Sequence, residues 1–237
     1  MKVARLALSV VLWMLVLGLA SFVASSKGLR GLTENSGWLS AGATIQVMIL
    51  ATSLVLILAI SRGKVTRYGF RLPTREQIRG TLVFGSIAAV TVHVLLAIFW
   101  RLCPTSGNHP GLTGASFLHI VIVVWILASI SEETLHRGLI QSFLHPLKEQ
   151  GVSLLSIRLS LPVLVAALLF GLMHIMLLTM GADGFFVGGV VGSATVLGLV
   201  AGYYREKSGS ILPAILVHVL FNAYGDIAQY LQELVIT

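Results

Sequence analysis

Charged residues are scarce in this chain of 237 residues: they make up 11% of it, whereas hydrophobic residues make up 56%. A soluble globular domain carries about 25% charged residues, so this composition excludes an ordinary water-soluble fold. Long stretches lack charge, and several reach the roughly 18 residues with which a helix crosses a bilayer. Helix is the expected element, because a backbone in lipid must satisfy its own hydrogen bonds.

Cysteine is almost absent too, since Cys103 is the only one. A single thiol excludes an internal disulfide and any cysteine cluster for zinc or iron–sulfur. Acidic residues are outnumbered, and the net charge of +7 could suggest a nucleic-acid partner. The basic excess lies between hydrophobic segments, however, where it indicates orientation and contact with anionic lipid. We therefore expect a lipid bilayer as the surroundings and no nucleic acid as partner.

Apolar runs occupy most of the sequence, at about 4–25, 38–60, 80–100, 115–143, 155–180, 185–204 and 210–235. They predict an all-α fold, a polytopic transmembrane helical bundle of about seven spans, as a single membrane domain over residues 1–237. The connection 61–79 holds several arginines and one acid, Glu76, so the positive-inside rule places it in the cytoplasm. An even number of spans precedes it. This predicts a multi-pass protein of the cell (inner) membrane with a cytoplasmic amino terminus.

Glycine is abundant, with 24 residues, and it crowds the sixth run. Gly184, Gly188 and Gly192 stand four residues apart, a spacing that lets helix backbones approach closely in lipid. We expect these glycines to pack against a neighbouring helix.

Three runs contain polar residues that a membrane span should avoid. An ionisable group within a span costs about 2.5–3.5 kcal/mol even on lenient insertion scales, so each one needs a partner or a purpose. The fourth run contains Glu132, Glu133, His136 and Arg137, the fifth contains His174, and the seventh contains His218 and Asn222.

Helical geometry separates the two glutamates. Glu133 and Arg137 are four residues apart on one face, which suits an ion pair, whereas Glu132 lies about 100° round the helix and can face other neighbours. If the fourth and fifth spans are antiparallel about a turn near Gly151, Glu132 and His174 lie at similar depth. The polar groups of three spans can therefore converge.

Such a set could perform hydrolysis. A carboxylate with an imidazole can hold and deprotonate water, and a second histidine with an asparagine can stabilise an oxyanion. Glu132, His174 and His218 would equally suit zinc with an open position for water, and the residues alone leave both readings open. Intramembrane Glu, His and Arg also serve proton relays, so a proton-coupled membrane transporter is an alternative, as is a non-catalytic membrane scaffold.

Three motifs occur in order within these spans: Glu132-Glu133-x-x-x-Arg137, Phe170-x-x-x-His174 and His218-x-x-x-Asn222. In this the chain resembles the CPBP/Abi family of intramembrane proteases, the CAAX prenyl protease type II and bacteriocin-processing group. The resemblance covers about residues 115–225, which it implies are the catalytic core.

The resemblance implies an intramembrane endopeptidase that cleaves a CAAX-type or leader/tail peptide in a membrane-associated substrate. By motif position, Glu132 with His174 would activate water and His218 with Asn222 would stabilise the oxyanion. Glu133, Arg137 and Phe170 would support them.

The family is often labelled a metalloprotease, but a metal-free glutamate mechanism has also been proposed for it. We favour the metal-free reading and expect no cofactor, with zinc on Glu132, His174 and His218 as the alternative. His136 departs from the family pattern, which usually has an aromatic or aliphatic residue there, and we interpret it as a packing substitution. The substrate's identity and the oligomeric state do not follow from the sequence.

Overall fold

The structure is a computed structural model that describes residues 2–28, 40–103, 115–154 and 157–236, with side chains through residue 229. The single helices along the bundle are α1 (Lys2–Ala24), α3 (Ala41–Ser61), α4 (Arg75–Leu102), α8 (Gly184–Ser208) and α9 (Leu212–Ile236). One composite helix joins α5 (Phe117–His119), η2 (Ile120–Ala128), α6 (Ser129–Glu133) and η3 (Thr134–Gln141). Another joins α7 (Leu161–Leu172) and η5 (Met173–Met180). Shorter elements are η1 (Val65–Tyr68), η4 (His145–Leu147), β1 (Gly151–Leu154) and β2 (Ile157–Ser160).

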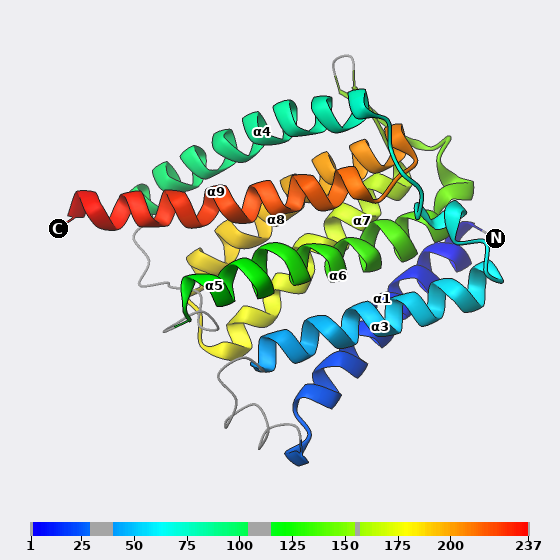
Figure 1. The fold of residues 1–237 in the computed structure, drawn as a ribbon, viewed down its shortest axis with the longest axis horizontal. Coiled ribbons are helices and arrows are strands. Elements are labelled where there is room, and N and C mark those ends of the chain that lie inside the picture. Colours follow the sequence, from blue (N-terminus) through cyan, green and yellow to red (C-terminus); the bar gives the residue numbers. More distant parts are fainter. Residues whose placement is uncertain (1, 29–39, 104–114, 155–156, 237) are drawn as a thin grey trace.

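These helices confirm the predicted all-α transmembrane bundle of about seven spans. Within the described residues, 6 helices are long and apolar enough to cross a membrane, and α9 is a further helix of 25 residues. In Figure 1 the long helices lie side by side along one direction. The chain is therefore a multi-pass membrane protein.

The fifth run differs from its prediction at the start. Residues 155–156 lie outside the described part, and the segment around them forms an antiparallel hairpin of β1 and β2 in place of a helix. The helix begins only at Leu161, because the Ser160 side chain accepts a hydrogen bond from the Val163 amide and caps it. The predicted turn near Gly151 thus exists as a small sheet, outside the apolar part of the span.

Loops gather at the two ends of the bundle. In Figure 1 the start of α1, the connection after α3, the hairpin and the turn between α8 and α9 lie at one end, whereas α9 finishes at the other. The basic segments predicted to share one side of the membrane therefore share one end of the molecule. Which side of the membrane this end faces stays a prediction.

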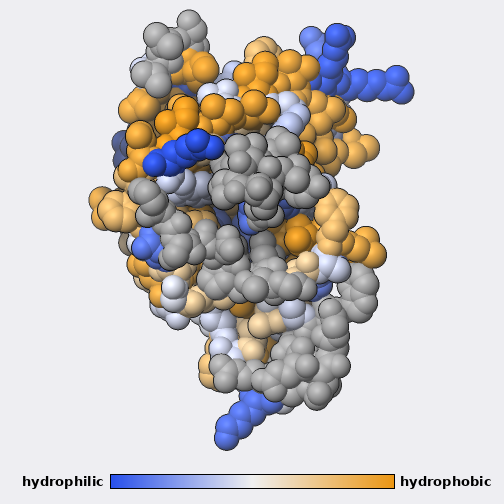
Figure 2. All heavy atoms as spheres, turned by 90° about the vertical axis from the view of Figure 1, so that its left-hand side faces the viewer, coloured by the Kyte–Doolittle hydropathy of each residue, from blue (hydrophilic) through white to orange (hydrophobic). Residues whose placement is uncertain are grey.

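The outer surface of the bundle is hydrophobic. Large apolar side chains are widely exposed along the helices, among them Phe22 (76%), Phe84 (62%) and Val55 (64%). Figure 2 shows hydrophobic residues around much of the rim, seen from the end at which α9 finishes. Such a surface suits lipid and would be costly in water.

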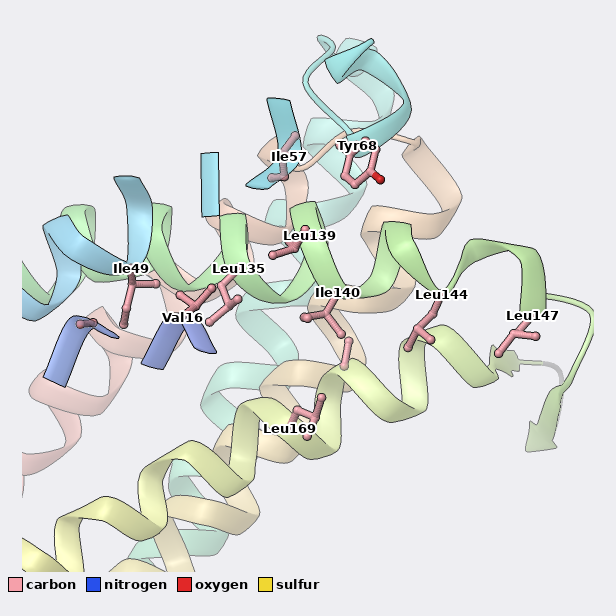
Figure 3. Packing of buried hydrophobic residues seen from close by; sticks show 12 residues of the cluster. Val16, Ile49, Ile57, Tyr68, Leu135, Leu139, Ile140, Leu144, Leu147 and Leu169 are labelled. Carbon is pink, nitrogen blue, oxygen red and sulfur yellow. The ribbon is translucent and has the colours of Figure 1, made fainter. Parts of the chain in front are cut away.

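The largest core cluster ties the fourth helix to three others. Leu135 and Leu139 of η3 are fully buried among Val16 of α1, Ile49 of α3 and Leu169 of α7. Figure 3 shows these side chains between the helices that carry them. This packing places the fourth helix, with its glutamates, in the middle of the bundle.

The glycine prediction is wrong in its positions. A Cβ at Gly184, Gly188 or Gly192 would meet nothing within 4 Å, so these glycines serve no close contact. The close approach occurs further along α8, where a Cβ at Gly198 would lie 2.8 Å from the Cα of Ala167 in α7. Glycine spacing indicates a helix surface that can pack closely but does not say which face does so.

Candidate active site

The fourth helix changes its winding around the glutamates. η2 and η3 are π-helical, and the short α-helical turn between them carries Glu132 and Glu133. π-helical segments are rare and occur often at functional sites. Their hydrogen bonds reach one residue further along the chain than those of an α-helix, and the wider turn alters which side chains face the neighbouring helices. An α-helical interpretation of the sequence misses this change.

Glu132 is nearly buried, with 7% of its surface exposed. Its Oε1 accepts a hydrogen bond of 2.7 Å from Nε2 of Gln46, which lies on α3. The Ser131 hydroxyl donates to Oε1 of the same amide, and this fixes which end of Gln46 faces Glu132. The other carboxylate oxygen, Oε2, lies 3.9 Å from Nε2 of His218.

Glu133 joins two helices. Its Oε1 lies 2.9 Å from Nη1 of Arg137 and accepts a 3.0 Å hydrogen bond from Nδ1 of His218 on α9. The predicted ion pair between Glu133 and Arg137 is therefore present. Both side chains are fully buried, in an environment where either charge alone would cost much free energy. His218 is therefore held at Nδ1 by one glutamate while Nε2 faces the other.

Local hydrogen bonds fix the tautomers of two more histidines. Nδ1 of His174 lies 3.0 Å from the Phe170 carbonyl oxygen, which can only accept, so Nδ1 carries the proton and neutral His174 keeps its lone pair on Nε2. In His136, Nδ1 donates to the Glu132 carbonyl and Nε2 accepts from the indole of Trp13 on α1. Both nitrogens of His136 are thus occupied, and it connects α1 to the backbone of Glu132.

Phe170 is the hub of the cluster. Its ring lies 5.0, 5.4 and 5.3 Å, centroid to centroid, from the imidazoles of His136, His174 and His218, all at steep edge contacts. The Arg137 guanidinium carbon lies 4.8 Å from the same centroid. The buried ring of Phe170 thus contacts three imidazoles and one guanidinium. These contacts explain why phenylalanine stands at the first position of the motif that ends in His174.

Asn222 lies one turn beyond His218 on α9. Its amide nitrogen donates to the carbonyl of Val124 at 2.9 Å and contacts the hydroxyl of Ser129 at 3.4 Å. One turn further, Asp226 accepts a 2.5 Å hydrogen bond from the indole of Trp125. A polar stripe on α9 therefore runs along the π-helical part of the fourth helix.

The structure brings the residues predicted from the sequence into one region. Glu132, Glu133, Arg137, Phe170, His174 and His218 are linked by the contacts above, with Asn222 at one side. The arrangement can polarise a water molecule and offer donors to a developing anion. Sequence reasoning missed Gln46 and Trp13. Gln46 gave a signal, because it is a polar amide within an otherwise apolar run.

A resident metal ion needs several ligating side chains that converge on one point. Among the residues that the structure describes, no three His, Cys, Asp or Glu side chains are grouped so that they could hold a metal ion. Glu132 and His218 face each other across 3.9 Å, but His174 does not complete a ligand set with them. The donor types suit zinc, whereas their placement here does not.

Comparison with known protein families gives a match over part of the chain. Residues 114–224 match the family described as type II CAAX prenyl endopeptidase Rce1-like, which confirms the resemblance carried by the three motifs. No curated protein and no solved structure matches the chain significantly.

Proposed function

We propose that this protein is an intramembrane endopeptidase, because residues 114–224 match the type II CAAX prenyl endopeptidase Rce1-like family. It hydrolyses a peptide bond in a membrane-associated substrate, a CAAX-type or leader/tail peptide. The observation that carries the proposal is the buried position of His218 between Glu132 and Glu133. Two helices, α6 and α9, supply these three groups, and a bundle in lipid has no structural need to gather them.

Water activation is assigned to Glu132 and His174. The water binds to Oε2 of Glu132, the oxygen that Gln46 leaves unused, and to the lone pair on Nε2 of His174. It attacks the scissile carbonyl carbon, a new C–O bond forms, and Glu132 takes the proton. The fixed tautomer of His174 supports this role, since it keeps an acceptor nitrogen available.

Oxyanion stabilisation is assigned to His218 and Asn222. Glu133, which also pairs with Arg137, accepts the hydrogen bond from Nδ1 of His218 and so directs Nε2 toward the site. When the imidazole carries both protons, its Nε2–H can donate to the oxyanion. For Asn222 to donate, one amide hydrogen must leave Ser129, the longer of its two contacts at 3.4 Å. Collapse of the intermediate breaks the C–N bond, and the proton held by Glu132 passes to the leaving nitrogen.

The mechanism proposed here takes no step through zinc. Zinc held by Glu132, His174 and His218 would supply a more acidic water, but these side chains are not placed as a ligand set in the structure. Elemental analysis of the purified protein, with activity measured before and after chelation, tests this directly. Stoichiometric zinc whose removal abolishes cleavage would contradict the metal-free proposal and leave the assignment as a protease intact.

The side of substrate entry is also a proposal. The basic segments at the α1 end of the bundle support a cytoplasmic location for that end. We propose the cell (inner) membrane as the location, with the amino terminus in the cytoplasm. The substrate then enters from the cytoplasmic half of the bilayer.

The test uses the full chain in proteoliposomes with a prenylated CAAX peptide and its unprenylated counterpart. Wild-type protein should produce cleaved peptide, Glu132→Gln should lose cleavage while remaining folded, and Glu149→Gln, at an exposed carboxylate, should cleave normally. Full activity of Glu132→Gln would overturn the assignment. Uptake of the peptide into the liposomes without cleavage would support the alternative of a proton-coupled membrane transporter.

A further inference from the structure

A second site lies at the end of the bundle where α1 begins. A cavity of about 800 Å³ opens there between η1, the end of η3 and the end of α8. Its lining is strongly basic, with Arg5, Arg67, Arg71 and Arg205 against a single carboxylate, Glu206. The catalytic glutamates and histidines proposed above do not line it.

Arg205 is the most informative of these residues. It is 91% buried, with 9% of its surface exposed, and its Nη2 donates to the Ser142 hydroxyl at 3.0 Å. Its Nε has no partner among the described residues. Gly69, at a φ of 93°, packs so close that a Cβ there would lie 2.6 Å from this Nε. The chain thus makes room for a buried guanidinium and leaves one of its donors unpaired, which costs free energy.

The other arginines keep donors available. Arg5 donates through Nη1 to the Phe143 carbonyl, and Arg71 donates through Nη2 to the Ser208 carbonyl. Each guanidinium has five N–H groups, so a single backbone bond orients it without exhausting it. Arg67 is exposed. These cations would repel one another unless an anion lay between them.

Glu206 does not supply that anion alone. Its Oε2 accepts a 2.5 Å hydrogen bond from the Ser160 hydroxyl, which draws the carboxylate toward the hairpin. One carboxylate also leaves the four guanidinium groups with a net charge of +3. The ligand chemistry that fits is a compact, multiply charged oxyanion such as phosphate, which arginines bind in paired hydrogen bonds.

We propose that this cavity binds a phosphate group, carried by the headgroup of an anionic lipid. Its position at one end of the transmembrane helices is the level at which headgroups lie. Ile60, 40% exposed, and Phe143 also line the cavity, so apolar side chains accompany the basic ones. Basic pockets between transmembrane helices are a recurrent form of headgroup site.

Native mass spectrometry of protein released from nanodiscs of equal phosphatidylglycerol and phosphatidylcholine tests the proposal. Wild-type protein should retain phosphatidylglycerol selectively. Arg67→Gln should weaken retention about fivefold, the factor that corresponds to about 1 kcal/mol per basic residue near a membrane. Arg205→Gln should weaken it more, and thermal unfolding checks that this variant folds. Arg79→Gln removes the same charge from an exposed position outside the cavity and should retain lipid normally.

A parallel measurement adds inorganic phosphate alone and follows thermal stability. Stabilisation by phosphate without lipid selectivity would support the anion site and reject the lipid as its source. Equal retention of the two lipids without any effect of phosphate would overturn the proposal. So would equal losses in Arg67→Gln and Arg79→Gln, because they would reduce the effect to general surface charge.

Discussion

Gln46 is expected to position Glu132 for catalysis although it lies outside the family segment. Its amide donates the 2.7 Å hydrogen bond to Oε1 of Glu132. Gln46→Met keeps a similar length and removes that donor. Because the lost partner is a carboxylate, the bond is worth about 1.5–3 kcal/mol. At tenfold per about 1.4 kcal/mol, the population of correctly oriented Glu132 falls by about 10- to 150-fold.

The assay is steady-state cleavage of a membrane peptide. We expect kcat to fall by about that factor with little change in KM, because Gln46 orients the base and has no assigned contact with substrate. In Ser131→Ala, kcat should fall less, since this change removes only the donor that orients the Gln46 amide. Ser53→Ala is the matched control: it alters a buried hydroxyl on the same helix that has no partner among the described residues. A folded Gln46→Met protein with wild-type kcat would refute the positioning role.

Three further predictions concern stability, measured by unfolding in detergent. Gly198→Ala should destabilise by about 1–3 kcal/mol, because the added methyl overlaps α7, whereas Gly192→Ala should be neutral; equal effects would contradict the packing. Arg137→Met should cost about 3–5 kcal/mol by removing the cation that pairs with a buried carboxylate, and a cost below about 1 kcal/mol would show that the pair is dispensable. Burial raises the pKa of Tyr68, with Arg5 opposing, so the unfolded chain ionises first and stability should fall as pH rises above about 10. That fall should be smaller in Tyr68→Phe, and an unchanged profile would contradict it.

The helical architecture could be predicted from the sequence because lipid imposes it. A charge-poor chain with long apolar runs has few structural options in a bilayer, and the seven predicted runs correspond to the long helices found. The exceptions have local causes. Residues 157–160 of the fifth run form strand β2 and pair with β1, up to the Ser160 cap, and periodicity alone does not distinguish a short apolar strand from a helix end.

The candidate site was only partly predictable. Glu133 and Arg137 follow from helical spacing, and the polar residues of three spans stood out from their apolar surroundings. The π-helical winding around Glu132 did not follow, because the spacing of the polar residues was interpreted with α-helical geometry. The contributions of Gln46 and Trp13 come from helices far away in sequence, and their pairing with Glu132 and His136 depends on three-dimensional contacts.

The central claim is that Glu132 and His218 act as one hydrolytic unit inside the bilayer. Single-turnover cleavage of the same peptide by Glu132→Gln, His218→Gln and the double variant measures this most directly. We expect each single variant to lose nearly all activity and the double variant to lose no more than either, as residues of one catalytic unit do. Losses that multiply in the double variant, or cleavage at the wild-type rate by either single variant, would contradict the account.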